Sequence, residues 1–228
     1  MDKSYKKIGR IAGLIFLINL VPYVIAQMGI LDGLFYTPDY LQKLPANTTS
    51  IGFAVILSFI SITAMLAFSL LIFPFLREFG NRLSIGYLGL RFVEFGILIY
   101  GLIKVLNLFE YSKLIKQSGL GELPSSQLWA DSLLNEWEWT GIIYMLVFVV
   151  HCLIFYYLLF VSRLVPKIIS IGGLVSTILA FANIINHLFD LEFGGFFLFA
   201  PIGIVELSLA VWLLIFGFKD ISTDSKSR

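Results

Sequence analysis

The chain has 228 residues, of which 58% are hydrophobic and 14% charged, whereas soluble proteins average about 45–50% apolar and about 25% charged residues. This composition excludes an ordinary soluble domain and indicates a protein that resides in a lipid bilayer. The net charge of +1 provides no long-range field for nucleic acid, and no basic patch is interleaved with aromatics, so nucleic acid is not an expected partner.

Six apolar segments are each long enough to cross a bilayer as a helix, which takes about 20 residues. The sequence therefore predicts an all-α, multi-pass membrane protein with a bundle of six transmembrane helices. The first segment is long and lacks a small-residue cleavage site, so we expect a retained helix and not a signal peptide. The predicted spans are Ile8–Ile30, Ile51–Leu76, Leu83–Leu108, Trp139–Val161, Ile168–Phe189 and Phe197–Phe218.

The basic residues between the spans predict the orientation, because Lys and Arg accumulate on the cytoplasmic side of a membrane. Both termini are therefore expected in the cytoplasm, with the protein in the cell (inner) membrane. This arrangement places on the cytoplasmic side Lys3, Lys6, Lys7, Arg10, Arg77, Arg82, Arg163, Lys167, Lys219, Lys226 and Arg228, and on the outer side only Lys43, Lys113 and Lys116.

The cytoplasmic connections at residues 77–82 and 162–167 are short, so the spans they join should be antiparallel neighbours. Residues 1–219 are expected to form a single six-span domain, and residues 220–228 a polar tail.

The first outer connection contains Thr37-Pro38-Asp39, the pattern of an N-cap residue followed by proline and an acid at a helix start. We expect a short helix from here through Leu44. Its apolar and aromatic side chains would lay it on the membrane surface: Tyr36, Tyr40, Leu41 and Leu44.

The second outer connection is expected to break at Gly119, Gly121 and Pro124, before Ser125 caps a new helix. That helix carries the aromatics favoured at the headgroup level: Trp129, Trp137 and Trp139. Both outer segments could cover a site, but anchoring at the membrane interface explains them as well and is the preferred interpretation.

Small residues at helical spacing predict where helices approach closely. Gly9 and Gly13 form one such pair, and Gly172, Ser176 and Ala180 continue the spacing over two turns. This pattern concerns packing and not chemistry.

Ionisable residues inside the spans are the main functional signal, since charge in hydrocarbon is costly. At about 1.5 Å of rise per residue, Arg91, Glu94, His151, Glu206 and the amide of Asn19 lie about 12–18 Å from the cytoplasmic ends of four spans. They therefore share one level of the membrane.

Arg91 and Glu94 are spaced i, i+3, so they share a helix face and can form an ion pair directed into the bundle. If Glu206 approaches the same arginine, the site contains one acid in excess, and Glu206 or His151 should carry a proton. Two interpretations remain open: a functional cavity, or a salt bridge that only fixes the helices.

A second polar cluster is predicted at the outer end of the fifth span, where Asn183, His187 and Asp190 lie together. A hydrated helix end is the preferred explanation. The two histidines differ too much in depth to share a zinc ion or a haem, so no metal and no cofactor are expected.

Several short motifs resemble the domain-of-unknown-function 4386 family, a bacterial integral-membrane family without an established activity. They are Arg10-Ile11-Ala12-Gly13-Leu14, Leu90-Arg91-Phe92-Val93-Glu94, His151-Cys152-Leu153 with Leu164-Val165-Pro166-Lys167, and Glu206-Leu207 leading to Trp212-Leu213-Leu214. The resemblance extends from about Lys6 to Lys219 and implies a bacterial membrane protein. It assigns no functional residues.

Val93-Glu94-Phe95 and Val205-Glu206-Leu207 occupy corresponding positions in the third and sixth spans, as an inverted repeat would place them. This favours a small carrier or ligand-binding membrane protein whose ligand is a small molecule or lipid. The alternatives are an intramembrane enzyme acting on a lipid or isoprenoid, with His151 as base and Glu206 as acid, and a non-catalytic partner subunit. The enzyme is less favoured because no nucleophile or metal set is recognisable. Six spans can form a complete bundle or require a homo-oligomer.

Overall fold

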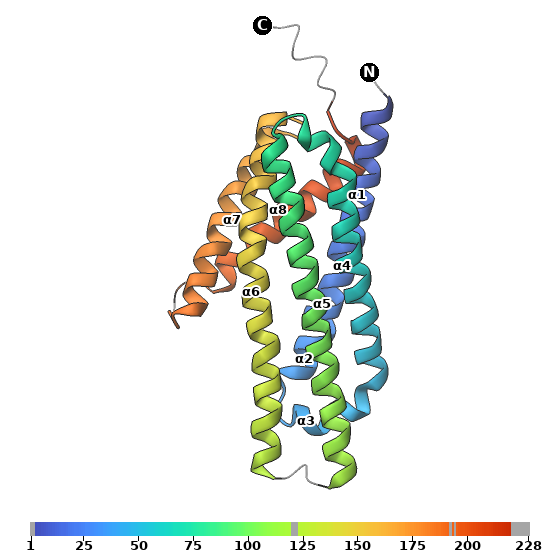
Figure 1. Ribbon diagram of the computed structural model, residues 1–228, viewed down its shortest axis with the longest axis vertical. Coiled ribbons are helices and arrows are strands. Elements are labelled where there is room, and N and C mark those ends of the chain that lie inside the picture. Colours follow the sequence, from blue (N-terminus) through green and yellow to red (C-terminus); the bar gives the residue numbers. More distant parts are fainter. Residues whose placement is uncertain (1–2, 120–122, 192, 194, 220–228) are drawn as a thin grey trace, which may run out of the picture. The chain divides into compact units, whose positions relative to one another are not determined.

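The computed structural model of the protein describes residues 3–119, 123–191, 193 and 195–219 and is all-α over these residues. The predicted break at Gly121 and the predicted polar tail at 220–228 lie outside them. Figure 1 shows the helices, which are α1 (Lys3–Val24), the π-helix η1 (Ile25–Leu31), α2 (Asp32–Phe35), α3 (Tyr40–Lys43), the 3-10 helix η2 (Leu44–Asn47), α4 (Thr48–Arg77), α5 (Asn81–Ser118), α6 (Pro124–Ser162), α7 (Lys167–Leu188) and α8 (Phe196–Phe216).

Six helices in the described part are long and apolar enough to cross a membrane, which confirms the predicted number of spans and their order. The backbone at Val24 and Asp32 is helical, so α1, η1 and α2 join into one of these helices, Tyr5–Phe35. The other candidates are Tyr40–Arg77, Asn81–Ser118, Pro124–Ser162, Lys167–Leu188 and Phe197–Phe216. The chain is therefore a multi-pass membrane protein.

The helices α5 and α6 are much longer than the predicted spans, with 38 and 39 residues. At 1.5 Å per residue, α5 is about 57 Å long, well beyond the hydrocarbon thickness of about 30 Å. The predicted helix bearing Trp129, Trp137 and Trp139 is present, but it is continuous with the predicted fourth span, because both lie in α6. The polar residues that precede Trp139 are compatible with a helix but are also typical of a connecting segment, so the sequence did not reveal that α6 is continuous.

Ser125 does not cap α6. The backbone amides of Ser126 and Gln127 both donate to the carbonyl oxygen of Leu123, so the helix begins at Pro124. Proline suits this position because its missing N–H would have no intrahelical partner there. The expected interruption at Gly119, whose φ is 69°, is present.

The chain forms two compact units, and α1, α4, α5 and α6 each contribute residues to both. Unit 1 comprises residues 1–18, 64–94 and 145–228, and unit 2 comprises residues 19–63 and 95–144.

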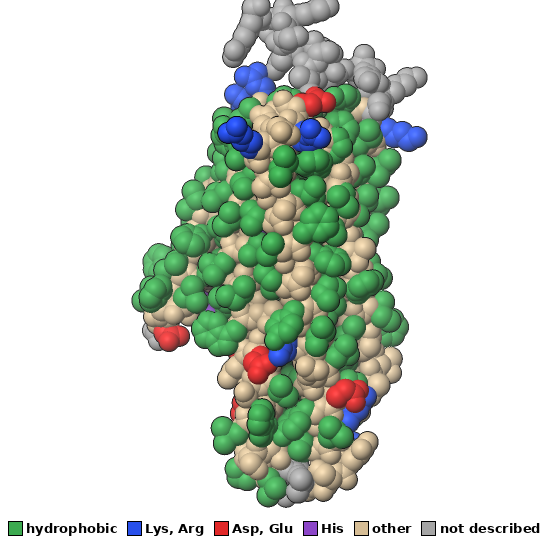
Figure 2. All heavy atoms as spheres, in the orientation of Figure 1, with side chains coloured by type: hydrophobic (Ala, Val, Ile, Leu, Met, Phe, Trp, Pro, Cys, Tyr) green, Lys and Arg blue, Asp and Glu red, His purple; other side chains and the backbone are tan. Residues whose placement is uncertain are grey.

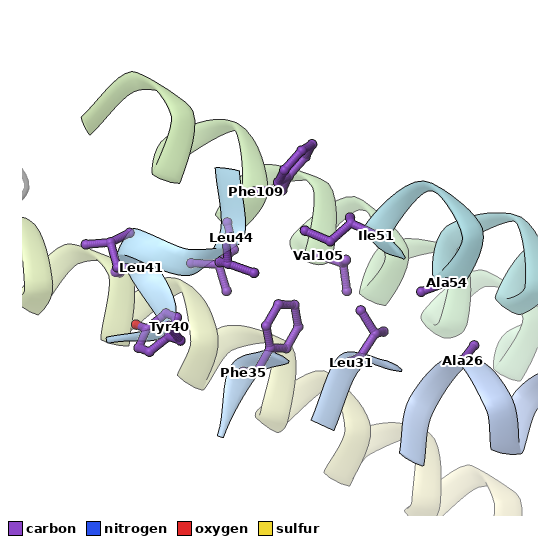
Figure 3. Packing of buried hydrophobic residues seen from close by; sticks show 12 residues of the cluster. Ala26, Leu31, Phe35, Tyr40, Leu41, Leu44, Ile51, Ala54, Val105 and Phe109 are labelled. Atoms are coloured by element: carbon purple, nitrogen blue, oxygen red, sulfur yellow. The ribbon is translucent and has the colours of Figure 1, made fainter. Parts of the chain in front are cut away.

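Unit 2 is built around a cluster of buried apolar side chains contributed by the connection between the first two candidate spans and the helices around it (Figure 3). Tyr40, Leu41 and Leu44 lie within this cluster and are almost fully buried. The prediction that they lie on the membrane surface is therefore wrong for these three residues. The remaining members are Ala26, Leu31, Phe35, Ile51, Ala54, Val105, Leu108, Phe109 and Ala130.

The predicted N-cap of the short helix is also wrong. Thr37 donates its hydroxyl to the Leu34 carbonyl oxygen, and the helix begins at Tyr40 after Asp39, whose φ of 61° is left-handed. Asp tolerates this conformation better than most residues because its short side chain bonds locally.

Unit 1 is closed by contact between its first and last helices. A Cβ atom placed on Gly9 or Gly13 would collide with the backbone of Phe218 or Leu214, so the predicted close approach at these glycines is confirmed. Arg10 donates from Nε and Nη2 to the Ile215 carbonyl oxygen at 3.2 and 3.0 Å. This arginine satisfies a carbonyl at the C-terminal end of α8, where a positive charge is also favourable.

The second small-residue prediction needs a correction of one position. A Cβ on Gly172 would make an ordinary contact of 3.4 Å with Val205 Cγ2, whereas a Cβ on Gly173 would overlap the Tyr156 ring. Ser176 and Ala180 are buried as expected. The close approach in α7 is therefore at Gly173, where the absence of a side chain accommodates an aromatic ring from α6.

Candidate polar site in unit 1

The centre of the site is an ion pair within α5. Nη1 of Arg91 lies 2.8 Å from Oε2 of Glu94, and the two residues are 3% and 0% exposed. The i, i+3 spacing read from the sequence places both on one face of the helix, which packs into unit 1. An isolated charge at such a position would cost several kcal/mol, so the pairing is needed to keep both residues there.

A directed chain of hydrogen bonds connects this ion pair to α4. Arg91 Nε donates to the Tyr87 hydroxyl at 3.3 Å, and the Tyr87 and Ser69 hydroxyls are 2.9 Å apart. Ser69 donates its proton to the Met65 carbonyl oxygen at 3.0 Å. Because the Ser69 proton is already committed, Tyr87 must be the donor to Ser69, and the chain runs in one direction from Arg91 to Met65.

His151 brings α6 to the same carboxylate. Its Nε2 lies 2.9 Å from Glu94 Oε2, without the alignment of a hydrogen bond. The fully buried ring is held edge-on by Phe148 and Tyr87, with centroid separations of 5.2 and 6.0 Å. Arg91, Glu94 and His151, which the sequence placed at one depth on two spans, thus meet at the Glu94 carboxylate.

Four buried polar atoms of the site have no hydrogen-bond partner among the described residues: Glu94 Oε1, Nδ1 and Nε2 of His151, and the Tyr156 hydroxyl. Buried polar atoms in folded proteins are hydrogen-bonded in about 90% or more of cases. A group left unsatisfied costs about 1–3 kcal/mol. The site therefore has more donors and acceptors than its own residues satisfy.

Glu206 on α8 lies near this network but does not join it directly. It is close enough to Arg91 and Glu94 for electrostatic interaction. No ion pair or hydrogen bond of its carboxyl group is recorded in the part of the chain that the structure describes, and the residue is partly exposed. The predicted approach of Glu206 to Arg91 is thus an approach at longer range, without contact.

Asn19, the fifth residue predicted for the site, belongs to unit 2. There its side-chain oxygen accepts a hydrogen bond of 3.0 Å from the Ser61 hydroxyl on α4. This bond satisfies a polar group inside an apolar helix and gives Asn19 a structural partner within its own unit.

At the end of α7, the structure records no hydrogen bond or ion pair that joins Asn183, His187 and Asp190 among the described residues. His187 and Asp190 are exposed, and Asp190 has a φ of 50° after the helix has ended. The neighbouring Asn186 accepts a hydrogen bond of 2.9 Å from the Phe193 amide and so fastens the following turn.

Sequence reasoning missed Tyr87, Ser69 and Tyr156 as members of the site. Tyr87 lies four residues before Arg91, a spacing that puts it on the same face and could have identified it. Ser69 and Tyr156 give no such signal, because both belong to other helices and meet the site only through packing.

Lys104 was also missed, although it is a charge inside the third predicted span. In unit 2 it pairs with Glu136 of α6 and lies 4.8 Å from the centre of the Tyr100 ring. Its partner was predicted to lie in a connecting segment, which concealed the pair.

A protein-family model described as "Domain of unknown function (DUF4386)" matches residues 11–217. No curated protein and no solved structure matches the chain.

Proposed function

We propose that this chain, which belongs to the domain of unknown function family DUF4386, is a small carrier or ligand-binding membrane protein. Its site is formed by Arg91, Glu94, His151 and Glu206. Residues 1–219 act as one membrane domain, with the lipid bilayer and a small molecule or lipid as partners.

The observation that carries this proposal is the set of unsatisfied polar atoms around the ion pair. A salt bridge that only fixes helices is stabilised best when every buried donor and acceptor is paired. Here one oxygen of Glu94 faces both Arg91 and His151, while its other oxygen, Nδ1 of His151 and the Tyr156 hydroxyl lack partners in the described chain. A polar ligand that accepts and donates hydrogen bonds would complete the set.

Contacts at one end of unit 1 support the proposed orientation, with both termini in the cytoplasm of a cell whose inner membrane holds the protein. The Lys219 amide donates to the Leu164 carbonyl oxygen at 2.8 Å, and the Phe218 and Phe75 rings are 5.5 Å apart. The end of α8 therefore meets the α6–α7 turn and the end of α4. Basic residues flank these segments, and Figure 2 shows Lys and Arg side chains gathered near this end of unit 1.

The proposal is tested by identifying what the purified protein carries. The wild-type protein is extracted from its native membrane in mild detergent, and bound small molecules and lipids are identified by mass spectrometry. We expect a polar or amphiphilic molecule in defined stoichiometry, which the folded variants Glu94→Gln and His151→Phe lose. Glu110→Gln is the matched control, because the Glu110 side chain is 63% exposed and pairs with Lys113.

An identified molecule is then offered to proteoliposomes to distinguish uptake from binding alone. Conversion of that molecule into a product would favour the intramembrane enzyme, and co-purification of another protein with no bound molecule would favour the partner subunit. An identical set of molecules in the wild type and both site variants would refute the proposed site.

A further inference from the structure

Glu206 differs from Glu94 in its surroundings, although both are glutamates within membrane-spanning helices. Glu94 is fully buried and contacts Arg91 and His151. Glu206 is partly exposed among the exposed apolar residues Ile204 and Leu207, and no partner of its carboxyl group is recorded in the described chain. One carboxyl group is therefore held inside the network, and the other borders the lipid-facing surface of α8.

The packing of α7 fixes the level of Glu206 relative to α6. Gly172 faces Val205 of α8, and the adjacent Gly173 faces the ring of Tyr156 of α6. Two consecutive residues of α7 therefore contact α8 and α6: Gly172 contacts Val205, which precedes Glu206, and Gly173 contacts Tyr156. The Tyr156 hydroxyl, which is fully buried and has no partner in the described residues, lies near enough to Glu206 for electrostatic interaction.

The charges that face Glu206 do not provide it with a counter-ion. On α5 the charges within electrostatic range are Arg91 and Glu94, which already form an ion pair of 2.8 Å. On α6 the groups within this range are Tyr156 and Cys152, which are neutral when protonated. The neighbouring residues of α7 are the glycines named above, which do not titrate. An ionised carboxylate without a partner is costly at this depth.

We infer that Glu206 is the exchangeable group of the site and that the coupling ion of this protein is a proton. This inference rests on the proposed function, because it names the ion that the same site takes up. Glu206 gains a proton from water when the site is open to one side of the membrane and returns it to water on release. Only one O–H bond forms and breaks, so no oxidant or reductant is required.

Glu94 and Glu206 have different roles because their contacts differ. Arg91 holds Glu94 in an ion pair of 2.8 Å, so Glu94 is not free to exchange a proton as Glu206 is. The Tyr156 hydroxyl is an unsatisfied hydrogen-bonding group within electrostatic range of Glu206. When Glu206 releases its proton, this hydroxyl can donate to the carboxylate and lower the cost of the charged state.

Hydrophobic carbodiimide labelling tests the inference without knowledge of the ligand. Dicyclohexylcarbodiimide enters lipid and adds to a protonated carboxyl group, and the acyl group then moves from oxygen to nitrogen. Nothing leaves in this reaction, so the protein gains the whole mass of one reagent molecule. The wild-type protein in proteoliposomes is labelled at several pH values and examined by intact-mass and peptide mass spectrometry.

We expect one adduct on Glu206, which disappears in Glu206→Gln and persists in the exposed-site control Glu110→Gln. Labelling should fall as the pH rises, because the proton is needed for the reaction. Tyr156→Phe removes the hydroxyl with little change in volume, so this variant should stay labelled at a pH where the wild type has ceased to react. An adduct on Glu94, or unlabelled Glu206 in folded protein at every pH, would overturn the inference.

The outcome is independent of the ligand search. If Glu206 is not labelled although the site variants lose a bound molecule, the site stands and its coupling ion is not a proton. If Glu206 is labelled and no molecule is bound, the protein contains a titrating carboxyl group but the proposed ligand site fails.

Discussion

At the scale of single residues, the ion pair of Arg91 and Glu94 determines whether the interior of unit 1 can remain folded. Both side chains are removed from solvent, and each depends on the other to offset the cost of burial. Nε2 of His151 lies against the same oxygen of Glu94 as a second polar neighbour. The three residues should therefore behave as one energetic unit.

The first prediction concerns this coupling. We expect Arg91→Met to lower the free energy of unfolding by about 3–5 kcal/mol, because a buried carboxylate is left without its counter-charge. The double variant Arg91→Met with Glu94→Gln should lose far less than the sum of the two single variants. Reversible unfolding in mixed micelles with increasing SDS measures these values.

The exposed pair Lys113 and Glu110 is the control, since such a pair is worth about 0–1 kcal/mol. Additive effects of Arg91→Met and Glu94→Gln would contradict the shared network. If the double variant folds and still binds the molecule found with the wild type, the pair is structural.

At the scale of elements, close helix contacts in unit 1 depend on single missing side chains. α7 presents Gly173 to the Tyr156 ring, and α1 presents Gly9 and Gly13 to the backbone at the end of α8. Inside a bilayer no hydrophobic driving force brings helices together, so close van der Waals packing of this kind is what associates them.

The second prediction separates neighbouring glycines of α7. Gly173→Ala should lower the free energy of unfolding by about 1–3 kcal/mol, the usual cost of overpacking, because the new methyl group meets an aromatic ring. Gly172→Ala should cost less, since its methyl group would make only a normal contact with Val205. Gly203→Ala on α8 is the control, because a Cβ there meets no atom within 4 Å.

These three variants are compared by unfolding under the same conditions. Equal losses for Gly172→Ala and Gly173→Ala would show that α7 does not pack as described. Improved helix propensity alone predicts a small gain at all three positions, so the sign of the change at Gly173 is informative.

At the scale of the whole molecule, six apolar helices require that connecting segments alternate between the two sides of the membrane. The third prediction is that cysteines introduced at Asp2 and Lys226 are cytoplasmic and that one at Gly119 is external. Cys152→Ser provides a cysteine-free background. An impermeant thiol reagent applied to intact cells should label only the cysteine at position 119, and labelling at either terminal position would reverse the map.

The sequence was sufficient for the number and order of the spans, because the length and polarity of a segment are local properties. It also located the Arg91 and Glu94 pair, whose spacing lies within one helix. The extra length of α5 and α6 was not predicted, because polar helical residues outside the apolar stretch look like a connection. The burial of Tyr40 and Leu44 was also missed, since an aromatic or leucine near an interface can face lipid or protein equally well.

Contacts between helices could be predicted only as a shared depth. His151 was placed at the level of Glu94 but not beside it, because the sequence contains no information on the rotation of α6. The same limitation hid Ser69 and Tyr156. Asn19 shared that depth as well, and its hydrogen bond with Ser61 shows that depth alone does not assign a residue to a site.

The contact between α1 and the end of α8 has a consequence for biosynthesis. α1 is synthesised before α8, so Gly9, Gly13 and Arg10 meet their partners only after α8 has been made. Unit 2 ends at residue 144 and contains none of α7 or α8. Unit 2 should therefore assemble during translation, while the polar site of unit 1 waits for release of the last helix. Nascent chains arrested after residue 144 should already protect residues 40–54 from proteolysis, and the N-terminal end of α1 should become protected only in longer chains.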